Sequence, residues 1–188
     1  MSSSTTLHTA THRASSSGIW VGVFAITMSF AAFTSALFVR EGTADWGHLT
    51  LPPILVMNTL FILASSGALE IARRELVKRK ELRKAAAWVA VTWLLGLCFC
   101  CGQYRAWLEL REQGIVLATN PNSSFFYVLT FMHALHVLAG LATLSYVLYR
   151  LRSRLGRFRN SLFENAAVYW HFMTALWVYL FILCRAKL

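Results

Sequence analysis

The chain has 188 residues, of which 57% are hydrophobic and only 14% are charged, and its net charge is +10. The apolar residues gather in long runs, and the stretches between them are too short to form a separate soluble domain. The positive charge lies mainly in two loops between apolar runs, so it gives no reason to expect nucleic acid as a partner.

Five segments are long and apolar enough to cross a membrane. A helix needs about 20 apolar residues to cross a hydrocarbon layer roughly 30 Å thick. The segments that reach this length lie at about 18–39, 51–72, 85–108, 125–149 and 165–184. We therefore predict an all-α fold, an integral membrane bundle of five transmembrane helices that forms one domain over residues 18–188.

The first 17 residues are rich in Ser and Thr and have little apolar content to pack against anything. We expect a disordered cytoplasmic tail over residues 1–17. A cleaved signal peptide is not expected, because the first apolar run starts late and is too long. The Ser, Thr and Arg content leaves a mitochondrial presequence as an alternative, which the single Arg13 supports only weakly.

The basic residues predict the orientation of the chain. Loops with many Lys and Arg residues stay in the cytoplasm. The second loop holds Arg73, Arg74, Lys78, Arg79, Lys80, Arg83 and Lys84, and the fourth holds Arg150, Arg152, Arg154, Arg157 and Arg159. The alternate loops, about 40–50 and 109–124, hold only Arg40 and Arg111 beside several acidic residues. The N-terminus is therefore expected inside and the C-terminus outside.

Ionisable and polar side chains at membrane depth are costly, so each needs a partner or a function. They recur at helical spacing on three of the predicted helices. The fourth carries His133 and His136 on the face of Gly140, which leaves room for a neighbouring backbone. The second carries Asn58, Thr59, Ser66 and Glu70, and the fifth carries Glu164, Trp170 and His171. We expect these groups to hydrogen-bond one another between helices and to form a buried polar network.

The spacing argues against a cofactor in this chain. At a rise of 1.5 Å per residue, His136 would lie about 20 Å from the cytoplasmic end and His171 only about 9 Å, which does not suit a bis-histidine haem. The Glu-x-x-His pairs of di-iron bundles do not occur in the predicted helices. Cys98, Cys100 and Cys101 form a C-x-C-C run. The adjacent Cys100 and Cys101 point in different directions and do not suit one tetrahedral metal, so we interpret the cysteines as packing residues. No catalytic or metal-binding residue is predicted.

Three motifs resemble cytochrome c oxidase subunit III, in the short five-helix form of bacterial haem-copper oxidases. The run from Phe163 to Phe172, with Glu164 and Tyr169-Trp170-His171, is similar to the family's last helix. Met132-His133-Ala134-Leu135-His136-Val137 is similar to its His-Gly-Leu-His-Val pattern. The third motif is similar to the Asn-Thr, Ser-Ser and Glu positions of another helix and consists of Asn58-Thr59, Ser65-Ser66 and Glu70.

The sequence departs from the family pattern at three places. Thr174 stands where the family usually has Asp, Ala106-Trp107 replaces a Glu-Tyr pair, and Ala134 replaces a Gly. Roles that those acids have in relatives are therefore not expected here.

The resemblance implies a haem-free accessory subunit that takes part in aerobic electron transport in a bacterial plasma membrane. Haem and copper would reside in partner subunits, subunit I being the direct neighbour and subunit II a further one, with a larger respiratory supercomplex as a possible assembly. Bound phospholipids are expected, and the subunit would support proton uptake and stability during turnover.

Other functions remain open at this stage. The same five helices are expected in a quinol oxidase or a nitric oxide reductase. From another class, a small proton-coupled transporter would use Glu70 and the central histidines as a relay. Transporters usually show internal repeats and helices broken by Gly or Pro, and the sequence shows neither. A haem-binding anchor subunit is the remaining alternative.

Overall fold

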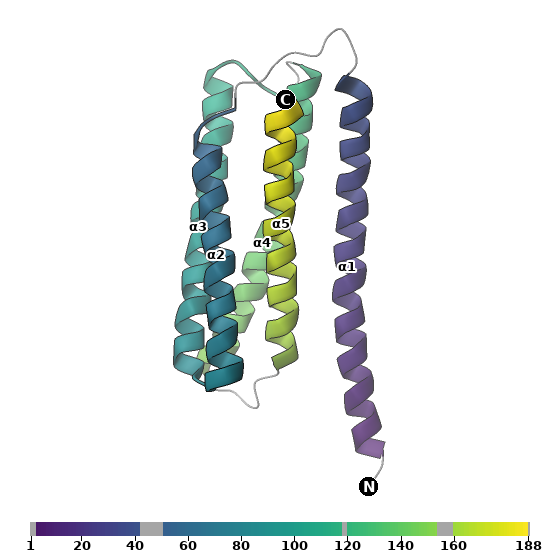
Figure 1. Cartoon of the computed structure of the whole chain (residues 1–188), viewed down its shortest axis with the longest axis vertical. Helices are drawn as coiled ribbons and strands as arrows, with labels where there is room; N and C mark the ends of the chain where they lie inside the picture. The colour runs from purple at the N-terminus through teal and green to yellow at the C-terminus, as the bar shows by residue number, and fades with distance from the viewer. Residues whose placement is uncertain (1–2, 42–50, 118–119, 154–159, 188) are drawn as a thin grey trace.

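The computed structural model describes residues 3–41, 51–117, 120–153 and 160–187, and all its regular elements over these ranges are helical. In chain order the helices are α1 (Ser3–Glu41), α2 (Ile54–Arg74), a π-helical turn η1 (Glu75–Arg79), α3 (Leu82–Glu112), α4 (Pro121–Ser153) and α5 (Asn160–Lys187) (Figure 1). Among the described residues, five helices contain stretches long and apolar enough to span a membrane. The predicted all-α membrane fold is confirmed.

Several helices extend beyond the apolar runs that predicted them. α4 runs over Pro121–Ser153 rather than 125–149, and α5 runs over Asn160–Lys187 rather than 165–184. Polar residues at a membrane interface continue the backbone hydrogen bonds of a helix, so composition marks the hydrocarbon depth better than the helix end. α2 instead begins late, because Pro52 and Pro53 precede it and Pro53 forms its N-cap.

The backbone of α1 is helical from Ser3, whereas the sequence led us to expect a disordered tail over residues 1–17. The part of α1 that is apolar enough to span a membrane is Gly18–Glu41. A helix that is already nucleated extends at little cost, since each further residue adds one hydrogen bond. This accounts for a helix that continues past its apolar part.

α2, α3, α4 and α5 pack around a common core, while α1 stands beside α4 and α5 (Figure 1). A short turn reverses the chain between α2 and α3, and Lys80 adopts the left-handed conformation there, with φ of 55°. The backbone N–H of Glu81 donates to the Glu75 carbonyl across the turn. α2 and α3 therefore lie antiparallel and in close contact along their length.

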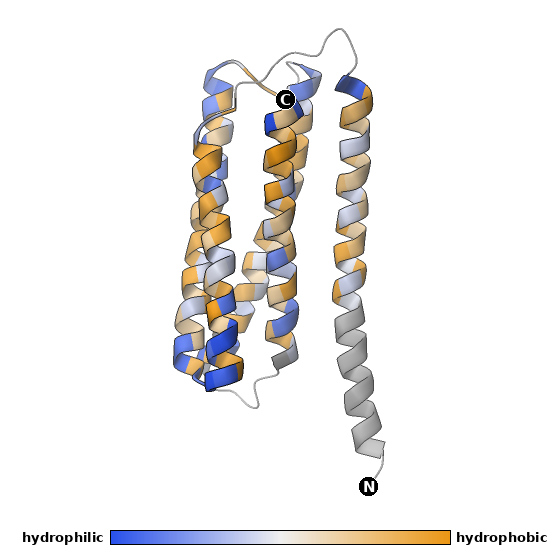
Figure 2. Cartoon of the chain, in the orientation of Figure 1, coloured by the Kyte–Doolittle hydropathy of each residue, from blue (hydrophilic) through white to orange (hydrophobic). Residues whose placement is uncertain are grey.

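Hydrophilic residues gather where α2 joins α3, while the middle of the bundle is mostly apolar (Figure 2). We call the end formed by the α2–α3 turn, the end of α4 and the start of α5 the basic end. Large apolar side chains such as Leu60, Leu94 and Leu138 point outwards along the bundle. An exposed apolar surface with polar ends is the pattern of a protein whose sides face lipid.

Candidate functional site

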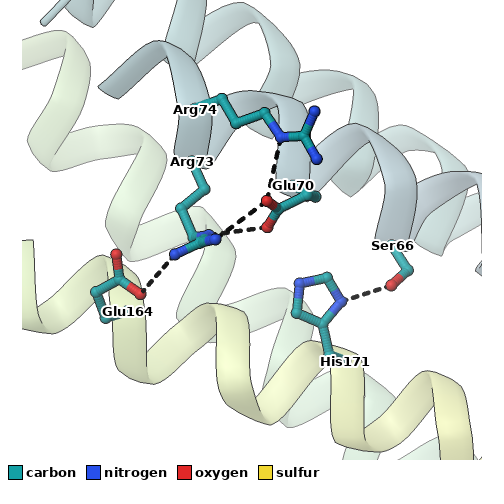
Figure 3. A network of polar contacts seen from close by, with 6 residues as sticks. All are labelled: Ser66, Glu70, Arg73, Arg74, Glu164 and His171. Carbon is teal, nitrogen blue, oxygen red and sulfur yellow. Dashed lines mark hydrogen bonds and ion pairs between the residues drawn. The ribbon is translucent and has the colours of Figure 1, made fainter. Parts of the chain in front are cut away.

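Polar side chains of α2 and α5 meet between the two helices near the basic end (Figure 3). Ser66, Glu70 and Arg73 lie along one stripe of α2, because residues four and three positions apart share a helix face. The Ser66 hydroxyl and Nδ1 of His171 are 2.6 Å apart, which is a hydrogen bond between the helices. Ser66 and His171, both expected to belong to a polar network, are thus brought together by α2 and α5.

Glu70 binds two arginines of its own helix. Nε of Arg73 is 2.8 Å from one carboxylate oxygen of Glu70, and Nε of Arg74 is 3.3 Å from the other. Nη1 of Arg73 also lies 3.9 Å from the carboxylate of Glu164 on α5, so Arg73 links the helices (Figure 3). The side chain of Glu70 is 31% exposed and that of Glu164 is 42% exposed. The structure thus places these two carboxylates at the rim of the interior, whereas the sequence suggested a buried network.

Two tryptophans of α5 bind hydroxyl groups of α2. The indole N–H of Trp170 donates to the Ser65 hydroxyl at 3.0 Å, and the indole N–H of Trp177 donates to the Thr59 hydroxyl at 3.0 Å. Both tryptophans are almost fully buried. Each bond satisfies a donor that would otherwise be unpaired in an apolar interior.

Trp170 lies at the centre of the four packed helices. A Cβ built at Gly96 of α3 would lie 2.8 Å from its Cη2 atom, and one built at Gly140 of α4 would lie 3.0 Å from its Cε3 atom. Both glycines therefore make room for the indole ring, whereas the sequence suggested that Gly140 admits a neighbouring backbone. With Ser65 on α2, the ring contacts three helices besides its own.

The two histidines of α4 have different surroundings. His133 is fully buried, and its ring lies 5.2 Å from that of Trp177 and 5.8 Å from that of Phe99. Nδ1 of His136 instead pairs with the Met132 carbonyl of its own helix at 2.6 Å. They do not converge on a shared ligand position with each other, and no group of three metal-ligating side chains is found among the residues that the structure describes.

Asn58 and His133 do not make the hydrogen bonds between helices that we expected. Both are fully buried, and neither has a hydrogen-bond partner in the described part of the chain. Gln103 of α3, which the sequence did not mark as a site residue, is likewise buried and has no hydrogen-bond partner in the described chain. A lone glutamine in an apolar run was the only available signal for it.

Sequence reasoning also missed two bonds between α3 and α4. The indole N–H of Trp107 donates to the Thr130 hydroxyl at 3.1 Å, and that of Trp93 donates to the Ser145 hydroxyl at 2.8 Å. Trp107 is one of the positions that depart from the family pattern, and here it takes part in helix packing. Tryptophan in a transmembrane run with Ser or Thr on the next helix is the signal that identifies such pairs.

These contacts define a multi-pass α-helical membrane protein in which tryptophan, hydroxyl and imidazole groups bind the helices to one another. The family model of cytochrome c oxidase subunit III matches residues 2–185. The chain belongs to the cytochrome c oxidase subunit III family. This confirms the family that the motifs of the last two helices and of the Asn58–Glu70 segment indicated.

The similar proteins include subunits of two kinds of oxidase, cytochrome c oxidases and a quinol oxidase. Cytochrome c oxidase subunit 3 of Synechocystis sp. is 33% identical over 169 residues, covering 89% of this chain and 69% of that protein. The protein of the same name from Corynebacterium diphtheriae is 33% identical over 166 residues, covering 82% and 79%. Quinol oxidase subunit 3 of Bacillus subtilis is 27% identical over 169 residues, covering 87% and 82%. The chain is thus a subunit of a respiratory oxidase complex.

Proposed function

We propose that this chain is the haem-free subunit III of a proton-pumping haem-copper oxidase and has no catalytic site of its own. The observation that supports this most is that the polar side chains between α2 and α5 bond to one another across the two helices. Trp170, His171 and Trp177 each bond to a hydroxyl group of α2. Side chains used in this way fix the helices relative to each other, which suits a subunit that supports a catalytic neighbour.

The proposed direct partner is oxidase subunit I, with subunit II in the same complex and a larger respiratory supercomplex as a further assembly. A bundle held in register presents a defined surface to a neighbour, and by doing so would support proton uptake and the stability of the complex during turnover. The haem and copper would belong to the partners.

We propose a cytochrome c oxidase as the parent complex. The Synechocystis and Corynebacterium relatives that carry this name are 33% identical to the chain, compared with 27% for the quinol oxidase subunit of Bacillus subtilis. A quinol oxidase is the alternative within the family.

The proposed location is the bacterial plasma membrane, with the N-terminus in the cytoplasm and the C-terminus outside. The α2–α3 turn and the described end of α4 lie at the same end of the bundle, so their arginines and lysines gather on one side (Figure 2). The positive-inside rule assigns that side to the cytoplasm. Arg154, Arg157 and Arg159, which supported the same prediction, lie outside the described residues.

A phospholipid site is proposed at the basic end. A cavity of about 680 Å³ there is lined by three basic residues and one acid, around the apolar Ala86 and Leu151. The charged residues are Lys80, Arg83, Arg152 and Glu81. A second cavity of about 450 Å³ shares Arg152 and continues between α3 and α4 past Trp93 and Leu148. Basic groups above an apolar groove suit an anionic headgroup with its acyl chain along the helices.

The first experiment is affinity purification of the tagged chain in mild detergent, with identification of the associated proteins and a reduced-minus-oxidised visible spectrum. Co-purification of subunits I and II with a haem signal is expected, and the haem types would narrow the electron donor. A chain that purifies alone and colourless would contradict the proposal and favour transport. A chain that alone retains haem would contradict it in favour of an anchor subunit.

The lipid site is tested in the same preparation with Arg152→Ala, because Arg152 lines both cavities. Lys78→Ala is the matched control, since Lys78 is an exposed base at the same end of the bundle. Anionic phospholipid per haem, measured by mass spectrometry, is expected to fall with Arg152→Ala and to stay constant with Lys78→Ala. An equal content in both variants would contradict the site.

A further inference from the structure

Three polar side chains are sealed in the bundle core without a partner among the described residues. Asn58 of α2, Gln103 of α3 and His133 of α4 are at most 1% exposed. Neither the amide nitrogen nor the amide oxygen of Asn58 and Gln103 makes a hydrogen bond in the described chain, and neither ring nitrogen of His133 does. Buried polar groups are nearly always hydrogen-bonded, so three such side chains in one bundle need an explanation.

The helix register places Gln103 and His133 at the same level. Trp107 of α3 binds Thr130 of α4, and the two helices run antiparallel. One turn back along α3 from Trp107 is Gln103, and one turn forward along α4 from Thr130 is Ala134, the neighbour of His133. Gln103 and His133 therefore differ in depth by only about 2 Å, from a rise of 1.5 Å per residue.

Asn58 reaches the same level from α2. A Cβ built at Gly102 would lie 1.9 Å from Oδ1 of Asn58, so the amide of Asn58 rests on the backbone of α3 next to Gln103. The residue after Asn58, Thr59, binds Trp177, and the ring of Trp177 lies 5.2 Å from that of His133. The three side chains thus form one layer across α2, α3 and α4, which we call the Asn–Gln–His layer.

The layer is enclosed by apolar and aromatic groups. The ring of Phe99 lies 4.7 Å from Trp177 and 5.8 Å from His133, at an edge-on angle to each, and it lies one turn along α3 from Gln103. In such surroundings a hydrogen bond is strong and an unpaired polar group is costly. The groups around the layer supply no hydrogen bond to it in the described chain, and the three side chains make none with one another.

The chemistry of the layer matches water. Two amides offer N–H donors and carbonyl acceptors, and an imidazole offers ring nitrogens that donate or accept. The layer carries no carboxylate, so it is poorly suited to a metal cation, and no group of three metal-ligating side chains is found in the described chain. A water molecule donates two hydrogen bonds and accepts two, and it binds best where several polar groups converge.

We propose that the Asn–Gln–His layer is an internal water site, with at least one water molecule bound between Asn58, Gln103 and His133. The water links α2, α3 and α4 through side chains that make no hydrogen bond of their own in the described chain. It completes the set of polar contacts between helices, beside the bonds of Trp170 and Trp177 to α2. This site is separate from the rim carboxylates Glu70 and Glu164.

The test is a cryo-electron microscopy map of the purified oxidase at about 2 Å resolution. Compact density is expected about 3 Å from polar atoms of at least two of the three side chains, which is an ordinary hydrogen-bond distance. Direct bonds among the three side chains with no such density would overturn the proposal. Extended density that requires an organic molecule would overturn it as well.

A second map of the Gln103→Met variant tests whether these residues hold the water. Met fills a similar volume without hydrogen-bonding strongly, so the density is expected to disappear or weaken while the helices stay in place. Thr130→Val is the control, because it removes a polar group that binds Trp107 and lies outside the layer. Density unchanged in Gln103→Met, or lost equally in both variants, would contradict the site.

Retention of the subunit in the complex gives a readout if a variant is too unstable for imaging. Gln103→Met alone leaves Asn58 and His133 without their water, so subunit III is expected to dissociate at several-fold lower concentrations of a denaturing detergent. The triple variant Asn58→Leu, Gln103→Met, His133→Phe removes every polar group of the layer and is expected to recover most of this loss. The single variants Asn58→Leu and His133→Phe are measured as well. A triple variant whose loss of detergent resistance equals the sum of the losses in the three single variants would contradict a shared site.

Discussion

Gly96→Ala is the change whose consequence the structure defines most closely. The added Cβ would lie 2.8 Å from Cδ2 of Leu141 and 2.8 Å from Cη2 of Trp170. The methyl group of Leu141 can rotate away, but the indole of Trp170 is held by its bond to Ser65 and by Gly140 on its other side. The ring has to move, and its hydrogen bond to α2 has to lengthen or break.

Gly67→Ala is the matched control, because a Cβ at Gly67 would meet nothing within 4 Å. Replacing Gly by Ala inside a helix stabilises it by about 0.5–1 kcal/mol, and this gain applies to both positions. Overpacking of a filled interior costs about 1–3 kcal/mol, and this loss applies only at Gly96. The two variants should therefore differ by about 1–3 kcal/mol, which is about 5-fold to 150-fold in an equilibrium constant.

The assay is the fraction of subunit III that stays in the purified oxidase at increasing concentrations of a denaturing detergent. We expect the Gly96→Ala midpoint to fall below that of the unmodified protein and the Gly67→Ala midpoint to equal or exceed it. The haem spectrum should be the same in both variants, since the change acts on packing. A Gly96→Ala protein as resistant as Gly67→Ala would refute the central role assigned to Trp170.

Three further predictions follow from the contacts. Ser65→Ala removes the acceptor of the Trp170 indole and should destabilise the subunit by about 0.6 kcal/mol, a typical value for such bonds in membranes. The same detergent titration measures this change, and an unchanged midpoint would contradict a bond of that strength. Glu70→Ala should lower retention of subunit III more than Glu81→Ala, because Glu70 binds both Arg73 and Arg74 whereas Glu81 pairs with Lys84 at the helix start. Haem lost in the Glu70 variant would count against an accessory role. A periplasmic reporter fused at the C-terminus should be active, and activity of a cytoplasmic reporter there would overturn the orientation drawn from the basic loops.

Glu70 shows which features of a site helical spacing can predict and which it cannot. The positions of Ser66 and Glu70 on one stripe of α2 followed from helical periodicity, and the structure places them there facing α5 (Figure 3). Helical periodicity does not predict how deeply a side chain is buried, because burial depends on which other helices pack against that face. Arg73 and Arg74, one turn further along α2, take both carboxylate oxygens of Glu70 and hold it at the rim.

The sequence by itself determined the class of protein, the number of spans and the family. Apolar runs of about 20 residues cannot remain in water and have to form helices in a bilayer, since the hydrocarbon offers the backbone no other partner. The motifs at Asn58-Thr59, at His133 to His136 and at Glu164 to His171 then indicated the family without any knowledge of how the helices pack.

The tertiary structure alone decided which polar groups meet. Hydrogen bonds form over about 3 Å, so a shift of one helix by a single turn, about 5 Å, would exchange every partner. The register set by Trp170 between Gly96 and Gly140 brings Ser65 to its indole and His171 to Ser66. The same register leaves Asn58, Gln103 and His133 together in the core, because side chains far apart in sequence share a layer only once the helices have packed.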